Sequence, residues 1–239
     1  MAMTLRELHR YPVKSLGGEA LEACEVDRRG LLGDRGWALV TADGGLAGGK
    51  RTRRFRRVDA VFALRSRLAD GAGEPPEIGW PDGSWSCVHE HGIEQRLSEH
   101  CGEPVRVRPE GASDVPWRDF MDSGRVSLVG TASLAAAAAL LGEREPLDAR
   151  RFRANLVVET DEPWVEERWV GRRVQVGALT LVGDQRIERC RMVDVAQVEV
   201  PERRGVLRML GQEREVCLAV YLDPEAAATV SVGDPVTVG

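Results

Sequence analysis

Apolar and polar positions alternate along much of the first half of the chain, which is the pattern of half-buried strands. The alternation is weak over residues 4–13 and clearer over residues 21–26, 37–41 and 58–68, and glycine-rich turns separate these segments. The first half is therefore predicted to form a β-meander or a barrel.

A hairpin and a helix are expected next. Residues 80–85 read Trp-Pro-Asp-Gly-Ser-Trp, which places turn-forming residues between two tryptophans and predicts a β-hairpin. Beyond it, the apolar spacing of residues 93–101 predicts a helix. Gly102 is the type of residue that ends one.

The composition changes near the middle of the chain. Residues 104–122 combine proline, glycine, aspartate and serine without clear periodicity, as in a boundary or a long connection between domains. We therefore expect one domain over residues 1–110 and a second over residues 111–239.

Strands are also expected to dominate the second half. A helix is predicted over residues 132–141, with Thr131 as its N-cap and Gly142 at its end. A shorter helix is predicted over residues 205–210. Strands rich in valine and leucine are expected at 156–159, 173–176, 179–182 and 216–222. The chain is thus predicted to be mainly β with a few helices, in the α+β class, and not a parallel βαβ enzyme.

Charge and hydropathy narrow the class of protein. The chain has 33 basic and 38 acidic residues, a formal net charge of −5, which argues against a general nucleic-acid binder. Its longest apolar run, residues 134–141, is far shorter than the roughly 20 residues that span a bilayer, and a signal-peptide pattern is absent. We expect a soluble, cytoplasmic protein with neither a membrane nor a nucleic-acid partner.

Cysteine usage points away from disulfides. The five cysteines are widely spaced and form no C-x-x-C pair, so neither a disulfide framework nor a zinc finger is expected. In a strand, Cys87, His89 and His91 would share one face. Zinc binding there is an alternative, although no fourth ligand with zinc-site spacing follows.

Three segments of the first half carry candidate contacts for anions. Residues 11–15, Tyr-Pro-Val-Lys-Ser, place one of only two lysines at a turn, which suits an anion; a solvated lysine is the alternative. Residues 30–35, Gly-Leu-Leu-Gly-Asp-Arg, are either a site or a structural turn. Residues 50–57 hold six basic residues in eight positions. A solvated or phosphate-facing loop is favoured there over a nucleic-acid interface.

The most concentrated polar cluster lies just before an expected strand. Arg150, Arg151 and Arg153 carry guanidinium forks, which recognise phosphate through paired hydrogen bonds. Asn155 offers both a donor and an acceptor to a heterocycle. Asp148 could instead pair with these arginines in a purely structural network.

A cysteine between two arginines is the second cluster. Cys190 lies between Arg189 and Arg191, where the positive charges would favour a thiolate. A thiolate is a nucleophile or a ligand for a soft metal. Burial as a small apolar residue is the alternative.

Taken in order, these segments resemble the family built from a MOSC domain (the C-terminal domain of molybdenum cofactor sulfurases) preceded by an N-terminal β-barrel partner domain. The resemblance covers nearly the whole chain. It rests on residues 11–15, 30–35, 37, 130–134, 148–156, 189–190 and 232–236. It implies an N-terminal β-barrel-like domain followed by a MOSC β-barrel domain.

The resemblance also implies a site for the molybdenum cofactor. In reductase members of the family, the cysteine at the position of Cys190 ligates molybdenum, which is held by the dithiolene of molybdopterin. Cys190 would then be both the catalytic residue and the metal ligand. Thr131 and Ser133 would attract phosphate at a helix N-terminus. The residues implied around the pterin and its anionic end are Lys14, Ser15, Arg35, Thr131, Ser133, Arg150, Arg151, Arg153 and Asn155.

The implied activity is that of a molybdenum-dependent oxidoreductase that reduces N-hydroxylated small molecules. Electrons would come from a separate reductase or ferredoxin, because we find no flavin, haem or iron–sulfur motif. Two alternatives stay open: a carrier of persulfide sulfur or of the cofactor, without turnover, and a non-enzymatic protein with a degenerate pocket. At the level of the family alone, pyridoxal phosphate binding is also implied.

Overall fold

Strands make up 36% of the computed structural model, which describes residues 3–69, 71 and 73–239. In the first half the strands are β1 (Met3–Arg10), β2 (Glu19–Ala20), β3 (Ala23–Asp27), β4 (Gly30–Leu31), β5 (Trp37–Thr41), β6 (Leu46–Gly48), β7 (Phe55–Arg57), β8 (Arg65–Arg67), β9 (Glu77–Gly79), β10 (Trp85–Cys87) and β11 (Val105–Pro109). In the second half they are β12 (Val126–Gly130), β13 (Leu156–Val158), β14 (Arg173–Val176), β15 (Leu179–Glu188), β16 (Cys217–Pro224), β17 (Ala228–Ser231) and β18 (Pro235–Val238).

Helices are few, as predicted. The α-helices are α1 (Ile93–Cys101), α2 (Thr131–Leu140) and α3 (Val206–Glu213). Short 3-10 helices lie at Asp59–Ala63, Ala149–Phe152, Val165–Trp169 and Arg191–Val193. The mainly β, α+β class is confirmed. Within the described residues, none of the helices has the length and apolar character needed to cross a bilayer.

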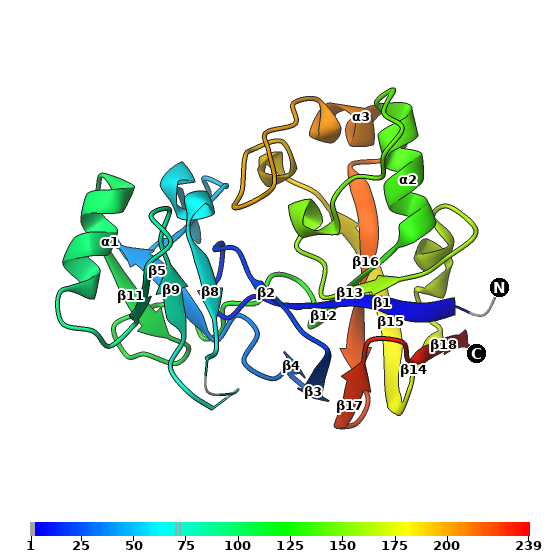
Figure 1. Ribbon diagram of the computed structural model, residues 1–239, viewed down its shortest axis with the longest axis horizontal. Helices are drawn as coiled ribbons and strands as arrows, with labels where there is room; N and C mark the ends of the chain where they lie inside the picture. Colours follow the sequence, from blue (N-terminus) through cyan, green and yellow to red (C-terminus); the bar gives the residue numbers. More distant parts are fainter. Residues whose placement is uncertain (1–2, 70, 72) are drawn as a thin grey trace.

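The strands gather into two lobes (Figure 1). One lobe carries α1 with β5, β8, β9 and β11, and the other carries α2 and α3 beside β12 to β16 and β18. In the second lobe, seven strands close into a barrel in the order β13-β12-β16-β15-β14-β18-β1, because β1 also pairs with β13. Closure leaves no free strand edge in the ring. The residues that fill its core include Leu5, Leu8, Leu128, Leu156, Val174, Leu181, Val220 and Val236.

The first strand of the chain belongs to the barrel of the second half. β1 places Leu8 opposite Leu156 and Met3 opposite Val236. β3 likewise pairs with β17. Strands from both predicted domains therefore share sheets, and the chain crosses from one lobe to the other directly after β1. The division between residues 110 and 111 stays a prediction.

The first lobe confirms two local predictions. β9 and β10 form the expected hairpin, with Trp85 opposite Gly79. α1 spans the predicted residues and ends at Gly102, whose φ of +72° is the left-handed conformation that glycine adopts easily. The core of this lobe includes Val13, Leu39, Phe62, Leu64, Ile78 and Leu97.

The strand predicted over residues 58–68 is wrong in its first part. Asp59–Ala63 is a 3-10 helix, and only Arg65–Arg67 is a strand. Val58, Val61 and Phe62 are each at most 3% exposed. Their spacing of three and four residues places them on one side of a helical turn, so the buried positions follow a helical period and not alternation.

The predicted cap of α2 is also wrong. Thr131 is the first helical residue, and Gly130 is the N-cap. The Gly130 amide donates to Glu166 Oε1 at 3.1 Å, and the Ala132 amide donates to Thr160 Oγ1 at 3.2 Å. Side chains from a distant loop therefore cap this helix, which the local sequence does not reveal.

Candidate functional site

A pocket with Cys190 in its wall lies between residues from both halves of the chain. We call it the cysteine pocket, and its volume is about 90 Å³. Cys190, Arg189 and Tyr221 also line a wider cavity of about 760 Å³, which we call the outer cavity. The wall of the cysteine pocket further includes Lys14, Ser15, Arg35, Gly48, Gly49, Lys50, Phe55, Asp122, Phe152, Arg153 and Met192.

Cys190 is partly exposed and lies just beyond the end of β15. Its backbone is extended, with φ −121° and ψ 176°, and it caps the 3-10 helix that follows. Arg191 is committed elsewhere, because its two terminal nitrogens each donate to an oxygen of Asp59 at 2.7 Å. Arg189 stays in the pocket wall. The thiol therefore shares its pocket with one of the two flanking arginines.

Two guanidinium groups in this wall have unused hydrogen-bonding capacity. Arg153 donates through Nη1 to Leu16 O. Arg189 donates to Leu218 O at 2.8 Å and to Phe152 O at 2.9 Å. In both arginines Nη2 is buried and has no hydrogen-bond partner among the described residues. Burial lowers the pKa of each group to about 10. Because buried donors without partners are costly, the pocket suits a ligand that brings acceptors.

An aromatic ring supports two of the pocket arginines. The guanidinium carbons of Arg153 and Arg35 lie 4.2 and 5.2 Å from the ring centroid of Tyr11, which is within cation–π range. Burial raises the pKa of Tyr11 to about 12, so the ring stays neutral. The Asp34 carboxylate forms an ion pair with Arg35 and accepts a hydrogen bond from the Tyr11 backbone amide at 2.7 Å. In the turn at residues 30–35, Asp34 therefore holds Arg35 and the Tyr11 backbone in place, whereas Arg35 lines the pocket.

Three pocket residues have backbone conformations that side chains rarely adopt. The φ values are +71° at Ser15, +51° at Arg35 and +54° at Arg153. Such strain persists only where the surrounding structure imposes it, and it clusters at ligand sites. Gly48 permits one close approach, since a Cβ there would lie 2.8 Å from Ser15 Oγ. The backbone of the pocket is therefore held in shape by its surroundings.

An ion pair lies at the mouth of the pocket. Lys14 is 5% exposed, and its Nζ lies 3.1 Å from Asp122 Oδ1. Burial lowers the pKa of Lys14 to about 8, although the charge of Asp122 opposes this shift. Desolvation alone would raise the pKa of Asp122, but the charges of Lys14, Lys50 and Arg35 hold it below its usual range. The pocket thus combines several cations with the carboxylates of Asp122 and Glu188.

The structure brings five of the predicted site residues into this pocket: Lys14, Ser15, Arg35, Arg153 and Cys190. They come from four separate segments of the sequence. Nothing in that result tests their roles, which stay predictions.

Asn155 lies behind the pocket wall, where its side chain joins strands. Its Oδ1 accepts the Ser127 amide at 3.1 Å and the Ser127 hydroxyl at 2.8 Å. Its Nδ2 donates to His9 O at 3.1 Å. Asn155 is 1% exposed, so these contacts occupy it as a link between β1 and β12.

Arg151 also has a structural partner set. It donates to Val193 O at 2.9 Å and to Pro201 O at 2.7 Å. Gln197 donates to Arg151 O at 3.1 Å. Arg151 therefore hydrogen-bonds to both ends of residues 193–201, the segment that follows Cys190. It lies outside the wall of the cysteine pocket.

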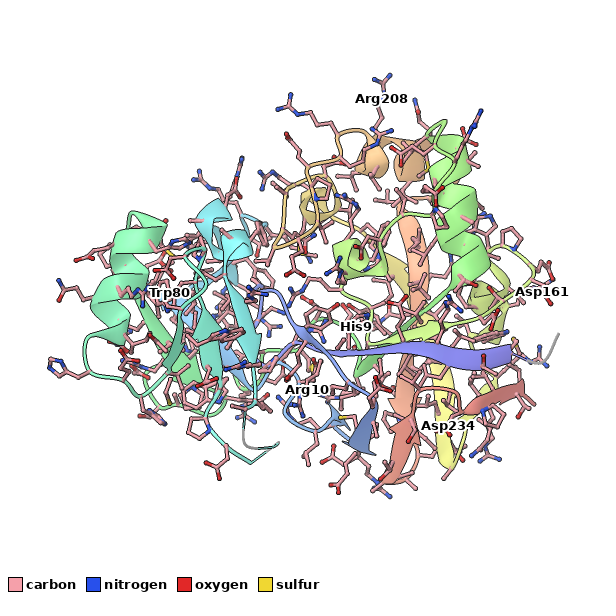
Figure 2. All side chains as sticks on the ribbon, viewed as in Figure 1. His9, Arg10, Trp80, Asp161, Arg208 and Asp234 are labelled. Carbon is pink, nitrogen blue, oxygen red and sulfur yellow. The ribbon has the colours of Figure 1, made fainter. Side chains whose placement is uncertain are left out.

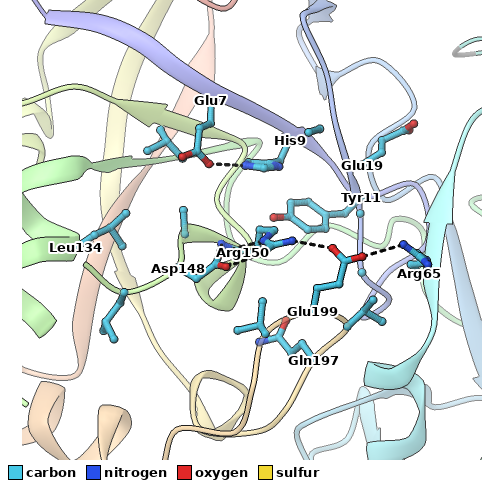
Figure 3. A pocket seen from close by; sticks show the side chains of 18 of the residues that line it. Glu7, His9, Tyr11, Glu19, Arg65, Leu134, Asp148, Arg150, Gln197 and Glu199 are labelled. Carbon is cyan, nitrogen blue, oxygen red and sulfur yellow. Dashed lines mark hydrogen bonds and ion pairs between the residues drawn. The ribbon is translucent and has the colours of Figure 1, made fainter. Parts of the chain in front are cut away.

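Thr131 and Arg150 line a different cavity of about 720 Å³, whose walls come from both halves of the chain (Figure 3). We call it the interface cavity. Arg150 pairs there with Glu199 at 3.0 Å. Ser133 is fully buried and donates to Glu166 Oε2 at 2.8 Å. The structure does not bring these three predicted residues to the cysteine pocket.

Ion pairs and hydrogen bonds cross the interface cavity. His9 Nε2 lies 2.9 Å from Glu7 Oε2, and Glu199 also pairs with Arg65 at 3.1 Å (Figure 3). His9 and Arg10 lie at the end of β1, between the two lobes (Figure 2). The labelled carboxylates of this cavity therefore all have partners: those of Glu7, Asp148 and Glu199 within the cavity, and that of Glu19 in Arg10.

Sequence reasoning missed several residues of the cysteine pocket, namely Lys50, Phe55, Asp122, Arg189 and Tyr221. Arg189 could have been found, because it is adjacent to Cys190. Lys50 is the second of the two lysines and was set aside with the basic run around it. Asp122 and Tyr221 have no local signal, since Asp122 lies in the irregular segment before β12 and Tyr221 in β16, and tertiary packing brings both to the pocket.

The zinc alternative finds no support. β10 ends at Cys87, and His89 and His91 lie in the turn beyond it, so the three side chains do not share the face of a strand. Among the described residues, no group of three or more histidine, cysteine, aspartate or glutamate side chains is placed to hold a metal ion.

Two family models match the chain, the MOSC domain at residues 116–237 and the MOSC N-terminal beta barrel domain at residues 2–72. The chain belongs to the MOSC domain family. It is similar to the protein named molybdenum cofactor sulfurase in Danio rerio (25% identity over 94% of this chain and 32% of the relative) and in Homo sapiens (23% over 96% and 31%). The chain thus spans about a third of the length of these relatives, and the family supports a function related to the molybdenum cofactor.

The YUAD protein from Bacillus subtilis has a similar fold. Its solved structure aligns with a TM-score of 0.54 at 13% sequence identity, over 100% of this chain and 96% of that one. At this identity the likeness concerns the fold alone.

The residues in the wall of the cysteine pocket have the chemistry that the cofactor implied by the family requires. A thiol is a soft ligand, and Cys190 is partly exposed in the wall. Arg153 and Arg189 hold buried donors without partners, as a group with anionic oxygens requires.

Proposed function

We propose that this chain binds the molybdenum cofactor in the cysteine pocket, with Cys190 as the protein ligand of molybdenum, and that it reduces N-hydroxylated compounds. One observation carries the proposal: a partly exposed thiol shares a pocket with two guanidinium groups whose buried Nη2 atoms have no partner. The pocket opens into the outer cavity, which is large enough for a small substrate.

Residues of this chain would hold and orient the cofactor. Arg153 and Arg189 would donate to its anionic oxygens, and Arg35 and Lys14 would add positive charge. Ser15 would contribute its hydroxyl at the same end. Asn155 and Arg151 would act behind the wall, by holding the strands and the segment that follows Cys190.

When bound, the molybdenum centre would supply the two-electron oxygen-atom chemistry, and the chain would control access and protons. Reduction of an N-hydroxyl group takes up two electrons and two protons and releases water. Lys14 Nζ can release and regain a proton near neutral pH because burial lowers its pKa to about 8. Phe55 and Tyr221 narrow the outer cavity beside Cys190. Electrons would come from a separate reductase or ferredoxin in the cytoplasm.

The test is expression in a molybdenum-replete host that makes the cofactor, followed by elemental analysis and pterin fluorescence. Bound molybdenum and pterin are expected in the wild type. A panel of N-hydroxylated substrates with reduced viologen as the donor should give turnover, whereas NADH alone should give none. Cys190→Ser should abolish turnover and change the molybdenum X-ray absorption spectrum.

Cys101→Ser is the matched control. Cys101 lies on α1, away from the cysteine pocket and the outer cavity, and it should keep full activity and metal content. An unchanged molybdenum spectrum in Cys190→Ser would overturn the assignment of the ligand. Metal-loaded protein without turnover above the Cys190→Ser background would overturn the reductase activity.

A second function is favoured by the relatives, which are named molybdenum cofactor sulfurases. In this alternative the chain carries persulfide sulfur on Cys190, or carries the cofactor, without reducing a substrate. Bound pterin without turnover, or a persulfide mass increment on Cys190, would select it. Pyridoxal phosphate binding stays an expectation of the family alone.

A further inference from the structure

A second thiol shares the outer cavity with Cys190. Cys217, at the start of β16, is 7% exposed, and it lines the outer cavity together with Cys190 and Glu188. All five cysteines of the chain are free thiols. The other three, Cys24, Cys87 and Cys101, line neither the cysteine pocket nor the outer cavity.

The register of β15 and β16 places the two thiols on one face of the sheet. Glu188 lies opposite Cys217, and the Arg189 amide donates to Val216 O at 2.9 Å. This is the pattern of a non-hydrogen-bonded antiparallel pair, in which the side chains lie close together. Cys190 is two extended residues beyond Glu188, so its side chain returns to the same face. In a regular antiparallel pair this position is the diagonal neighbour of Cys217, and the Cα atoms of diagonal neighbours lie roughly 7–8 Å apart.

Bridging the two thiols requires only a small movement. A disulfide needs Cα atoms roughly 4.4–6.8 Å apart, so a pair at the diagonal distance must close by at least roughly 0.2–1.2 Å to come into that range. The ladder between β15 and β16 ends at this point, because the Val216 amide donates to Leu210 O and not to Arg189 O. Cys190 then leads straight into a 3-10 turn. The movement thus falls on backbone that the sheet no longer holds.

We propose that Cys190 and Cys217 form an intramolecular disulfide when a peroxide oxidises the cofactor-free protein. The inference goes beyond the proposed function, because it concerns the two thiols whether or not the chain binds molybdenum. It assigns Cys217 as the resolving thiol of the outer cavity.

The reaction has two balanced steps. Cys190, as its thiolate, attacks a peroxide oxygen: an S–O bond forms and the O–O bond breaks. The other oxygen leaves as hydroxide and takes up the thiol proton as water, which leaves a sulfenic acid on Cys190. The Cys217 sulfur then attacks the sulfenic sulfur, so that the S–S bond forms and the S–O bond breaks. Hydroxide leaves and takes the Cys217 proton as water. The two thiols together lose the two electrons that the peroxide gains.

The bridge would protect the pocket while it is empty. A sulfenic acid without a resolving thiol proceeds to sulfinic acid, which ordinary thiols do not reduce, whereas a disulfide is reversible. A disulfide would also occupy the Cys190 sulfur and remove it as a metal ligand. The bridge and a metal on Cys190 are therefore mutually exclusive.

The test uses the full chain purified from a host that does not make the cofactor. After treatment with hydrogen peroxide, free thiols are blocked with N-ethylmaleimide, and the protein is cleaved after glutamate. Peptides 189–199 and 216–225 each hold one of the two cysteines, and they should be recovered joined. The number of free thiols per chain should fall from five to three, and dithiothreitol should restore it.

Variants separate this bridge from general oxidation. Cys217→Ala, or Cys217→Ser if the alanine variant is poorly folded, should yield no joined peptide and should drive Cys190 to sulfinic acid. Cys101→Ala, the matched control, should keep the joined peptide. The proposal is overturned if wild-type Cys190 stays reduced, if it reaches sulfinic acid without a joined peptide, or if it links two chains. None of these readouts depends on molybdenum, so a failure here is distinct from a failure of the proposed function.

Discussion

The cysteine pocket and the interface cavity both draw residues from the two halves of the chain, but they differ in how their charges are satisfied. The interface cavity is far larger, about 720 Å³ against about 90 Å³. Its carboxylates have partners, such as His9 for Glu7 and Arg65 for Glu199. In the cysteine pocket, the buried Nη2 atoms of Arg153 and Arg189 have none among the described residues.

If the proposed function holds, volume is a poor guide to the ligand site of this molecule. A ligand in the interface cavity would have to break existing ion pairs. A ligand with anionic oxygens in the cysteine pocket would instead satisfy donors that burial has stripped of water. Unmet hydrogen-bonding capacity therefore favours the smaller pocket as the functional one.

The largest effect on stability should come from the helix end beside the interface cavity. Glu166 is fully buried and accepts hydrogen bonds from the Gly130 amide and the Ser133 hydroxyl. Glu166→Ala would leave both donors without a partner and should lower the free energy of unfolding by roughly 2–4 kcal/mol. Chemical denaturation measures the change.

Glu166→Gln is the matched variant, because its amide keeps the shape and one acceptor oxygen. It should lose less than half as much stability as Glu166→Ala. If Glu166→Ala were as stable as the wild type, the donors at the start of α2 would not depend on Glu166. Thr131 and Ser133 would then again be candidates for an anion site.

The next effect should be on cofactor retention in the cysteine pocket. Arg153→Ala removes a buried guanidinium group and should weaken pterin binding by about 1.5–3 kcal/mol, roughly 10- to 150-fold. Arg150→Ala should leave binding unchanged, since Arg150 lies in the interface cavity. Pterin fluorescence after stepwise dialysis gives the comparison.

The two arginines are three positions apart, so they form a close pair of variants. Unfolding midpoints of both proteins must first show that each is folded. Equal pterin loss from Arg153→Ala and Arg150→Ala would break the distinction between the two cavities.

A smaller effect should appear as a pH dependence of stability. Lys14 has a folded pKa of about 8 against an ordinary value of 10.5, so between these values the unfolded chain binds more protons than the folded chain. Stability should therefore rise with pH across that window and fall as pH drops through about 8, by at most about 3 kcal/mol. Denaturation at several pH values reports the slope.

Lys14→Met provides the reference for this slope. It removes the titrating group, and its unfolding free energy should be flatter than that of the wild type between pH 8 and 10.5. Parallel curves for the two proteins would show that burial does not perturb Lys14.

The smallest effect is expected for the ion pairs that cross the interface cavity. Arg150 and Glu199 are about half exposed, and such pairs contribute roughly 0–1 kcal/mol. Glu199→Gln should therefore change the free energy of unfolding by less than about 1 kcal/mol. A larger loss would show that these pairs hold the two lobes together, and the interface cavity would need to be treated as a functional element.

Local features of the fold were predictable from the sequence. α1 and its terminal Gly102 follow from apolar spacing and a glycine stop, and the hairpin follows from a Pro-Asp-Gly turn between tryptophans. The strand predicted at residues 58–68 failed, because its buried residues follow a helical period over a short stretch. The sequence was sufficient to predict an element where its conformation depends on residues close to it along the chain.

The candidate site was only partly predictable, for a different reason. The chemistry of Lys14, Arg35, Arg153 and Cys190 was visible in the sequence, and the structure places all four in one pocket. Asp122 and Tyr221 were not visible, because tertiary packing brings them to the pocket from an irregular segment and from a barrel strand. The resemblance to a family helped to identify the site residues, because it supplied the order in which the motifs follow one another along the chain. The spacing of residues alone did not supply that order.

By itself, the sequence determined the strand-rich class, the first helix and the types of residue available for anion and metal binding, since these depend on composition and short-range pattern. Only the tertiary structure decided what three neighbouring arginines do. Arg150 lines the interface cavity, Arg151 hydrogen-bonds to the segment after Cys190, and Arg153 lines the cysteine pocket. A 3-10 helix that ends in the left-handed Arg153 turns the three side chains in different directions, and their partners come from remote strands and loops.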